Sequence, residues 1–187
     1  YGNLTSNGYN IFGNTDGCNI SVGANDLLDI DPKLNTFLPS RGYQPIKSNS
    51  PARNSANSLT CLSADQRGMP RVGVCDRGAY EYTTPGAAAV IEIVAGDNQR
   101  TAPRTPFPMQ FKVVILDANG SPVSGQDVEF SAPATGPSGL FANNTTLYSV
   151  ATDIGGVATA TTFTANNRSG TYIVSASASA GSANFNV

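Results

Sequence analysis

Apolar residues follow two different patterns along the chain, and the change falls near "TTPGAAA", residues 83–89. Before this stretch they form short bursts, such as "YNIF", "TFL" and "QPI", separated by Asn, Gly, Asp and Pro. After it, apolar and polar residues alternate over longer runs, which is typical of half-buried strands. No window shows a sustained helical period. The pattern predicts an all-β chain with two domains, residues 1–84 and 85–187.

The second domain reads as seven strands. In "GQDVEFSA", Val128 and Phe130 share one face while Asp127 and Glu129 take the other. In "FKVVILD" both faces are apolar, which indicates a central strand. Seven strands with Gly, Pro, Asn and Asp in the connections predict a β-sandwich. The seven stretches are "AVIEIVAG", "MQFKVVILDANG", "QDVEFSAP", "TTLYSVATD", "GVATATTFTA", "GTYIVSASAS" and "SANFNV".

Composition narrows the class of protein. Charged residues make up 13% of the 187 residues, about half the usual share of roughly 25%, so Ser, Thr, Asn and Gly must supply the polar surface. This suits an extracellular β protein. The net charge of -2 offers no footprint for nucleic acid or anionic membrane. No apolar run approaches the ~20 residues that span a bilayer. The chain opens on Tyr1 without a signal peptide, so we expect a cut N-terminus.

Histidine is absent, which excludes His-dependent triads and the usual zinc ligand. The three cysteines are too scattered for a zinc site. In a secreted chain, Cys61 and Cys75 would close a short loop, with a stabilisation of about 3 kcal/mol. We therefore predict a Cys61–Cys75 disulfide, with Cys18 reduced and sheltered or bonded outside this chain.

Residues 88–187 resemble a bacterial immunoglobulin-like repeat of the Big-1, or invasin/intimin-like, type. The similarity rests on "VVILDANGSPVSGQDVEFSAP" and on "ATDIGGVATATTFTANNRSGTYIVSASASAG". Turns are expected at Asp117–Gly120 and Asp153–Gly156, where glycine suits a positive φ. A late strand would bury the ring of Tyr172. The resemblance implies an Ig-like β-sandwich.

Residues 8–82 resemble the last turns of right-handed parallel β-helices on bacterial surface proteins, the group called choice-of-anchor Q. The matching stretches are "GYNIFGNTDGC", "DIDPKL", "SNSPARNSA" and "CLSADQRGMPRVGVCDRGAYEY". The match is strongest at residues 65–81. Arg77 stands where the family has an apolar residue. The resemblance implies a short right-handed parallel β-helix end with a cap.

The charged stretch at residues 65–82 could be an active site or a structural cap, and we favour the cap. A β-helix ends with unpaired N–H and C=O groups that a capping segment must satisfy. Arginine suits this task because its planar fork can bridge carboxylates and carbonyls. We expect Arg67 and Arg71 to bind Asp65, Asp76 or backbone carbonyls.

Further residues have expected roles in this cap. The Cys61–Cys75 disulfide would fix the loop, and Ala79 with Tyr80 or Tyr82 would fill the core. Tight bends are expected at Gly68, Gly73 and Gly78.

Carboxylates near residues 16–31 are the other candidate site. Asp26, Asp29 and Asp31, with Asp16 nearby, could gather around Ca²⁺. Their spacing does not match an EF-hand loop, and an ordinary loop is the favoured interpretation. The same carboxylates could form a glycosidase or lyase pair, since β-helices often carry polysaccharide-cleaving enzymes.

The sequence therefore favours a non-enzymatic, secreted or cell-surface bacterial protein without cofactors: a stalk, an adhesin segment or a fibre subunit. A carbohydrate-binding module, or a remnant of a β-helical polysaccharide-degrading enzyme, is the alternative. The stretch "YGNLTSNGYNIFGN" begins in mid-repeat, so we expect residues 1–15 to pair with upstream β-helix rungs or another copy. Surface glycans and host proteins are further candidate partners.

Overall fold

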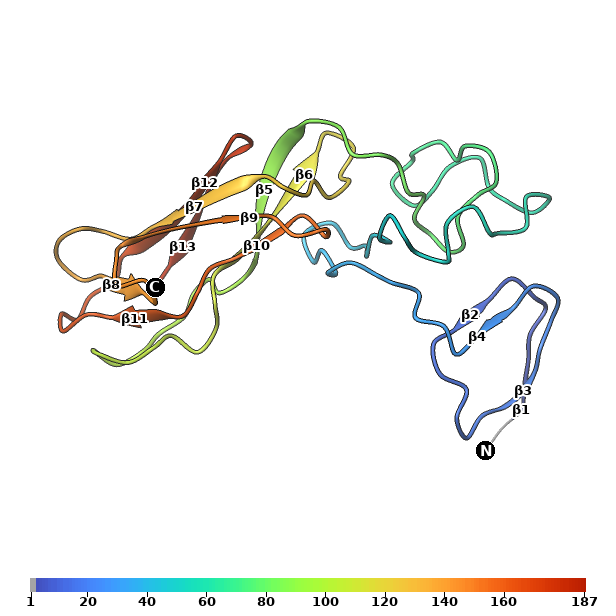
Figure 1. The fold of residues 1–187 in the computed structure, drawn as a ribbon, viewed down its shortest axis with the longest axis horizontal. Helices are drawn as coiled ribbons and strands as arrows, with labels where there is room; N and C mark the ends of the chain where they lie inside the picture. Colours follow the sequence, from blue (N-terminus) through green and yellow to red (C-terminus); the bar gives the residue numbers. More distant parts are fainter. Residues whose placement is uncertain (1–2) are drawn as a thin grey trace. The chain divides into compact units, whose positions relative to one another are not determined.

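The computed structural model describes residues 3–187 and is all-β, with no helix among them. The chain separates into two compact units, Tyr1–Thr84 and Pro85–Val187, hereafter the N-terminal and C-terminal units (Figure 1). The boundary lies at the change of apolar pattern in the sequence.

The C-terminal unit contains nine strands in three antiparallel sheets. One sheet has the order β10-β6-β5, another β13-β12-β7-β9, and the third pairs β11 with β8. The strands are β5 (Ala88–Ala95), β6 (Lys112–Asp117), β7 (Asp127–Ser131), β8 (Gly139–Phe141), β9 (Leu147–Ala151), β10 (Val157–Thr159), β11 (Phe163–Ala165), β12 (Ile173–Ala178) and β13 (Gly181–Asn186).

The prediction of seven strands in this unit was wrong at two places. The stretch 156–165 forms two strands, because β10 pairs with β6 whereas β11 pairs with β8. A single predicted strand therefore changes sheets between Thr159 and Phe163. The second error is β8, whose three residues follow a Gly- and Pro-rich stretch and show no alternation long enough to recognise.

An aromatic core fills the C-terminal unit. Phe111, Phe130, Phe141 and Phe185 are at most 1% exposed, and the rings of Phe141 and Phe163 lie 4.7 Å apart. Burial alternates along β7, as predicted, and β6 is central and buried on both faces. Aromatic pairs in such contact add about 0.5–1.5 kcal/mol to the burial of their surface.

Two turns at one end of the C-terminal unit share one hydrogen-bond pattern. The Oδ1 atom of Asp117 accepts the N–H groups of Asn119 (2.9 Å) and Ser121 (2.8 Å). Asp153 Oδ1 does the same for Gly155 and Val157, two and four residues ahead. The third residue after each aspartate is a glycine with φ of 75° or 73°, a conformation that favours glycine. Both predicted turns are confirmed.

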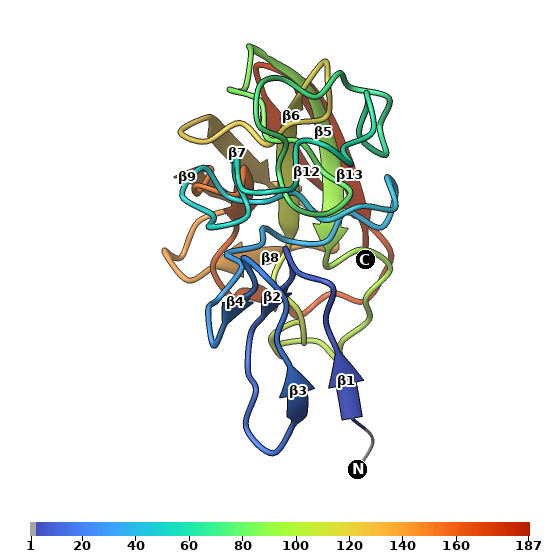
Figure 2. The same cartoon turned by 90° about the vertical axis from the view of Figure 1, so that its right-hand side faces the viewer.

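The N-terminal unit begins with two parallel strand pairs. β1 (Asn3–Thr5) pairs with β3 (Asn19–Ser21), and β2 (Ile11–Phe12) pairs with β4 (Leu27–Leu28). Figure 2 shows β1 and β3 side by side and pointing the same way. The side chains of Asn19 and Asn3, sixteen residues apart, are joined by a 2.6 Å hydrogen bond. Both pairs keep this spacing, so two successive coils of the chain have the same length.

Glycines allow the two coils to approach closely. A Cβ atom on Gly23 would lie 2.2 Å from the backbone nitrogen of Gly8, and one on Gly8 would lie 2.3 Å from the carbonyl oxygen of Ala24. Such distances exclude any side chain. The backbone of Tyr9, with φ of 61°, donates to the same Ala24 carbonyl at 3.0 Å.

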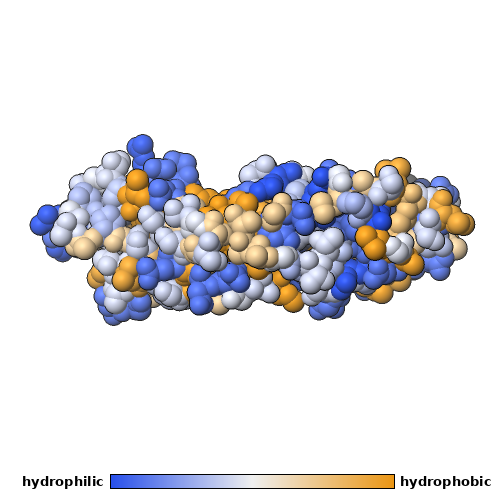
Figure 3. Space-filling view, turned by 90° about the horizontal axis from the view of Figure 1, so that it is seen from above, coloured by the Kyte–Doolittle hydropathy of each residue, from blue (hydrophilic) through white to orange (hydrophobic). Residues whose placement is uncertain are grey.

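Residues 29–84 contain isolated bridges but no strand within the described part of this unit. Leu38, Tyr43, Ile46 and Tyr80 are buried there. Ten large apolar side chains of the N-terminal unit are nevertheless exposed, among them Leu59 at 93%. Figure 3 shows apolar residues interspersed with polar ones over the visible face.

Candidate functional site

Polar side chains gather at two places, one in each unit. The first is an ionic cluster in the N-terminal unit, made of Asp65, Arg67, Arg71, Asp76 and Glu81. Asp65, Asp76 and Glu81 are buried. The second is a cavity at one end of the C-terminal unit.

Asp65 organises the first turn of the ionic cluster. Its Oδ1 atom accepts the N–H groups of Arg67 (2.8 Å) and Met69 (3.1 Å), the pattern of the turns at Asp117 and Asp153. Its Oδ2 atom accepts Arg67 Nε (2.8 Å) and the Glu81 N–H (3.0 Å). Burial opposes ionisation, but these hydrogen bonds outweigh it and lower the pKa of Asp65 below its ordinary value.

Arg71 binds a different carboxylate from the two that were predicted. Its Nη1 atom lies 3.0 Å from Glu81 Oε2, and the same nitrogen donates to the Asp76 carbonyl. Nη2 donates to the Gly78 carbonyl at 2.6 Å. The predicted bonds to backbone carbonyls are thus present. The carboxylate partner is Glu81, whose oxygens also accept the backbone N–H groups of Val72 and Asp76.

Asp76 holds two backbone segments together. Its Oδ1 atom accepts the N–H of Asn54 at 2.7 Å, and Oδ2 accepts the N–H of Tyr82 at 2.5 Å. Burial raises the pKa of Asp76 above its ordinary value, even though these two hydrogen bonds favour the carboxylate. The pKa values of Asp65 and Asp76 are therefore shifted in opposite directions from the ordinary value of an aspartate.

Aromatic rings lie beneath the cluster. The guanidinium of Arg67 is 3.8 Å from the ring centroid of Tyr80, whose ring packs 5.7 Å from that of Tyr43. Tyr80 is buried, as predicted, whereas Ala79 is exposed and does not fill the core. The chain bends at residues 77–79, and Ala79 lies in the exposed part of this bend. The bends are made by Gly68, Gly73 and Gly78, with φ of 79°, 71° and 90°.

A disulfide joins Cys61 to Cys75, fourteen residues apart. It indicates an oxidising environment. Cys18 is free and exposed, so the expectation that it is sheltered was wrong. It directly precedes β3, within a two-coil segment in which no described residue reaches full burial.

Arg77 connects this segment to the parallel coils, a role that the sequence did not reveal. Its Nε atom donates to the Ser55 carbonyl at 2.8 Å, and Nη1 donates to the Asn10 carbonyl at 2.9 Å. Asn10 directly precedes β2. The signal in the sequence was an arginine at a position where the resemblance led us to expect an apolar residue, and its partners lie far away along the chain.

The carboxylates considered for Ca²⁺ do not gather. Asp26 accepts the N–H groups of Asn10 and Gly23, Asp29 accepts Thr15, and Asp31 accepts the Lys33 N–H. A hydrogen bond with the Ser6 side chain leads the effects that lower the pKa of Asp26. Within residues 3–187, no group of three His, Cys, Asp or Glu side chains could hold a metal ion. In the structure, these three carboxylates accept hydrogen bonds from nearby residues of the coils.

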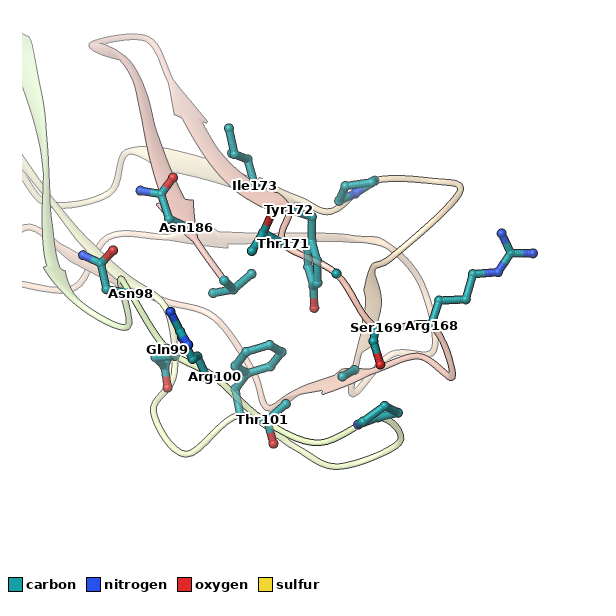
Figure 4. Close-up of a pocket in the computed structure, with 16 residues that line it drawn as sticks. Asn98, Gln99, Arg100, Thr101, Arg168, Ser169, Thr171, Tyr172, Ile173 and Asn186 are labelled. Atoms are coloured by element: carbon teal, nitrogen blue, oxygen red, sulfur yellow. The ribbon is translucent and has the colours of Figure 1, made fainter.

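The cavity of the C-terminal unit has a volume of about 920 Å³. Its walls come from residues 98–107, residues 165–173, Pro133, and Asn186 with Val187 at the end of β13. Figure 4 shows Arg100 and Thr101 on one side and Ser169 and Tyr172 on the other. Sequence reasoning missed this site because the three main segments are far apart in the chain.

Tyr172 links the cavity to the aromatic core. Its ring meets that of Phe107 edge to face, with centroids 6.5 Å apart. Its hydroxyl oxygen is buried and has no hydrogen-bond partner among the described residues. Burial raises the pKa of Tyr172 to about 12.

Comparisons with known proteins give no relative. No family model matches the chain, and no curated protein or solved structure shows a significant match. Among the described residues, no helix has the length and apolar character to cross a membrane.

Proposed function

We propose that this chain is a non-enzymatic segment of a secreted or cell-surface bacterial protein, with a structural or adhesive role. Residues 1–84 would be the C-terminal part of a right-handed parallel β-helix with its cap. The observation that carries this proposal is the sixteen-residue spacing shared by the parallel pairs β1–β3 and β2–β4. Stacked coils of equal length are how a solenoid builds its core.

Residues 65–82 support the capping role. Arg67 and Arg71 bind three backbone carbonyls, those of Asp76, Gly78 and Glu81, in addition to two carboxylates. Arg77 adds a contact to the Asn10 carbonyl of the coils. A segment that satisfies backbone groups in this way can close a β-helix, whose end otherwise exposes unpaired groups.

Residues 85–187 would form an immunoglobulin-like β-sandwich. Support comes from the two main antiparallel sheets, whose inward residues share one aromatic core. Modules of this kind serve as rigid spacers, which suits a stalk.

Surface labelling tests the proposed location and role. Antibodies against the chain should label intact cells of the bacterium that makes it, and proteinase treatment of intact cells should remove the label. Labelling that requires cell lysis would contradict the proposal. Incubation of the chain with a panel of polysaccharides should release no reducing ends, and release would favour the enzyme remnant instead.

The free edge of β1 is the proposed contact for a further polypeptide segment. Within the described residues, β1 pairs with β3 alone. A rung of a longer β-helix or a strand of a second copy could extend this sheet by parallel pairing. The proposal covers residues 1–15, of which residues 1 and 2 lie outside the described part. A strictly monomeric chain with protected amides in residues 3–15 would contradict both versions.

A binding module is the second candidate function, and the cavity in the C-terminal unit favours it. Its volume of about 920 Å³ lies within the range of about 300–1,000 Å³ that is usual for small-molecule sites.

A further inference from the structure

The cavity of the C-terminal unit carries an inference beyond a structural role, and its walls are the starting point. Hydroxyl and amide side chains alternate there with aromatic and proline rings. Ser169 and Thr171 offer hydroxyls, and the Thr101 hydroxyl also bonds Thr105 and the Pro106 carbonyl. Asn98 and Asn186 offer amides whose Nδ2 atoms also donate to Asp97. Each of these groups can both donate and accept a hydrogen bond. This dual capacity matches sugar hydroxyls, which also do both.

Charge is distributed unevenly in this unit. Its three arginines, Arg100, Arg104 and Arg168, lie on the two loops that border the cavity. Arg100 and Arg168 belong to the wall, and Figure 4 shows Arg168 extending away from the other labelled residues, at the rim. None of the sixteen described lining residues is Asp or Glu.

Most carboxylates of the unit lie elsewhere. The register places Asp117 beside Ala88 and Lys112 beside Ala95, so Asp117 lies at the opposite end of the β5–β6 pair from the loop that carries Arg100. Asp97 does approach the cavity, but its Oδ1 atom accepts the N–H of Asn186 at 2.8 Å. The wall itself therefore presents arginine and no Asp or Glu, while Asp97 beside it is engaged by Asn98 and Asn186. An arginine in the wall favours an anion.

The aromatic wall supplies the remaining element. Phe107 and Tyr172 present ring surface between the polar groups, and the buried Tyr172 hydroxyl has no hydrogen-bond partner within the described part of the chain. Ring surface with a few polar groups around it is the usual composition of a small-molecule site.

We propose that this cavity binds a short acidic oligosaccharide, with Arg100 binding a sugar carboxylate and the hydroxyl and amide side chains binding sugar hydroxyls. This proposal does not rest on the role of the N-terminal unit, since a stalk without a glycan site would still label the cell surface.

Titration of the full chain, followed by amide chemical shifts, tests the proposal. The probes are trigalacturonate, triguluronate and sialyllactose, each at about 1 mM, where half-saturation corresponds to about -4 kcal/mol. At least one should shift the amides of residues 98–101 and 168–173 in a saturable manner. The neutral methyl ester of the bound sugar should bind about tenfold more weakly. Absence of shifts with all three acidic sugars would overturn the proposal.

Two matched arginine variants distinguish specific binding of the acidic sugar in the cavity from unspecific electrostatic attraction to the positive charges of the loop. Arg100→Gln should weaken binding about tenfold, about 1.4 kcal/mol, while Arg104→Gln removes the same charge from the same loop outside the wall and should leave affinity unchanged. Equal losses in both variants would show unspecific attraction and overturn the proposal. Equal binding of triglutamate would do so as well, because it would indicate an acidic peptide or protein as the ligand.

Discussion

Different interactions stabilise the interior of each of the two units. Among residues 3–187, seventeen buried apolar residues lie in the C-terminal unit and six in the N-terminal unit. Ten of the fifteen exposed large apolar side chains described belong to the N-terminal unit. The disulfide and three of the four buried acidic residues also lie in the N-terminal unit. Apolar burial dominates one unit, and cross-links with charged hydrogen bonds dominate the other.

The comparison indicates which interactions can stabilise a segment of only two stacked β-coils. Two coils with strands of two or three residues cannot enclose a core, and no residue from Asn3 to Leu34 reaches full burial. Stability must come from the segment that packs on them, since small units bury too little surface without cross-links. Arginine serves there because it satisfies several acceptors while its guanidinium covers a ring, as Arg67 does over Tyr80.

Removal of a core ring should have the largest effect on stability, and this effect should be limited to the C-terminal unit. Phe111 is fully buried and contacts the rings of Phe163 and Phe185. Phe111→Ala should lower the free energy of unfolding of this unit by about 3–5 kcal/mol. Calorimetry should show a shift in one thermal transition. Leu140→Ala, at a half-exposed site, is the control and should change it by less than about 0.5 kcal/mol.

Loss of the disulfide should destabilise the N-terminal unit and leave the stability of the C-terminal unit unchanged. The double variant Cys61→Ala, Cys75→Ala should destabilise the N-terminal unit by about 3 kcal/mol and leave the transition of the C-terminal unit in place. Cys18→Ala should have no effect, because this residue is exposed and free. If the double variant melts like the parent chain, the disulfide does not stabilise the cap.

Truncation of a cluster arginine should have a smaller effect on the same unit. Arg71→Ala removes the guanidinium that donates to the Asp76 and Gly78 carbonyls and to Glu81 Oε2, and it should cost about 1–3 kcal/mol. The same range is expected for Arg67→Ala. Arg104→Ala, at an exposed position, serves as the control. Unchanged melting midpoints in both cluster variants would contradict a capping role.

The pH dependence should distinguish the two buried aspartates. The lowered pKa of Asp65 means that its ionised form stabilises the fold above the unfolded pKa, and this contribution is lost as the pH falls through the folded value. The raised pKa of Asp76 has the opposite sign, so stability declines as the pH rises from the unfolded pKa through the folded one.

Two variants read out this difference. The destabilisation caused by Asp65→Asn should shrink as the pH is lowered below about 3.8, whereas that caused by Asp76→Asn should grow as the pH is lowered from 7 toward 3.8. Denaturant unfolding across this pH range measures both. Parallel curves for the two variants would show that the environments of the two carboxylates are alike.

Local patterns were sufficient for some features and not for others. The alternation in β7, the buried β6 and the turns at Asp117 and Asp153 depend on neighbours in sequence, and all were predicted. The division of residues 156–165 into β10 and β11 depends on pairing partners in different sheets. Periodicity within one segment cannot reveal such partners.

The sites show the same limit. The stretch 65–82 was recognisable because its charges are concentrated in an otherwise weakly charged chain. Its pairing of Arg71 with Glu81 was not, because Asp65, Asp76 and Glu81 are equivalent candidates in the sequence. The cavity joins segments seventy to ninety residues apart, such as Arg100 and Tyr172, and no local motif identifies it.

Hydrogen exchange before and after reduction of the disulfide tests most directly whether the N-terminal unit depends on its cross-links. Reduction should accelerate exchange at residues 52–82, where the Ala56 N–H donates to the Cys75 carbonyl and the Asn54 N–H donates to Asp76 Oδ1. It should leave β6 and β12 as protected as before. Unchanged exchange in residues 52–82, or equal acceleration in both units, would contradict this account.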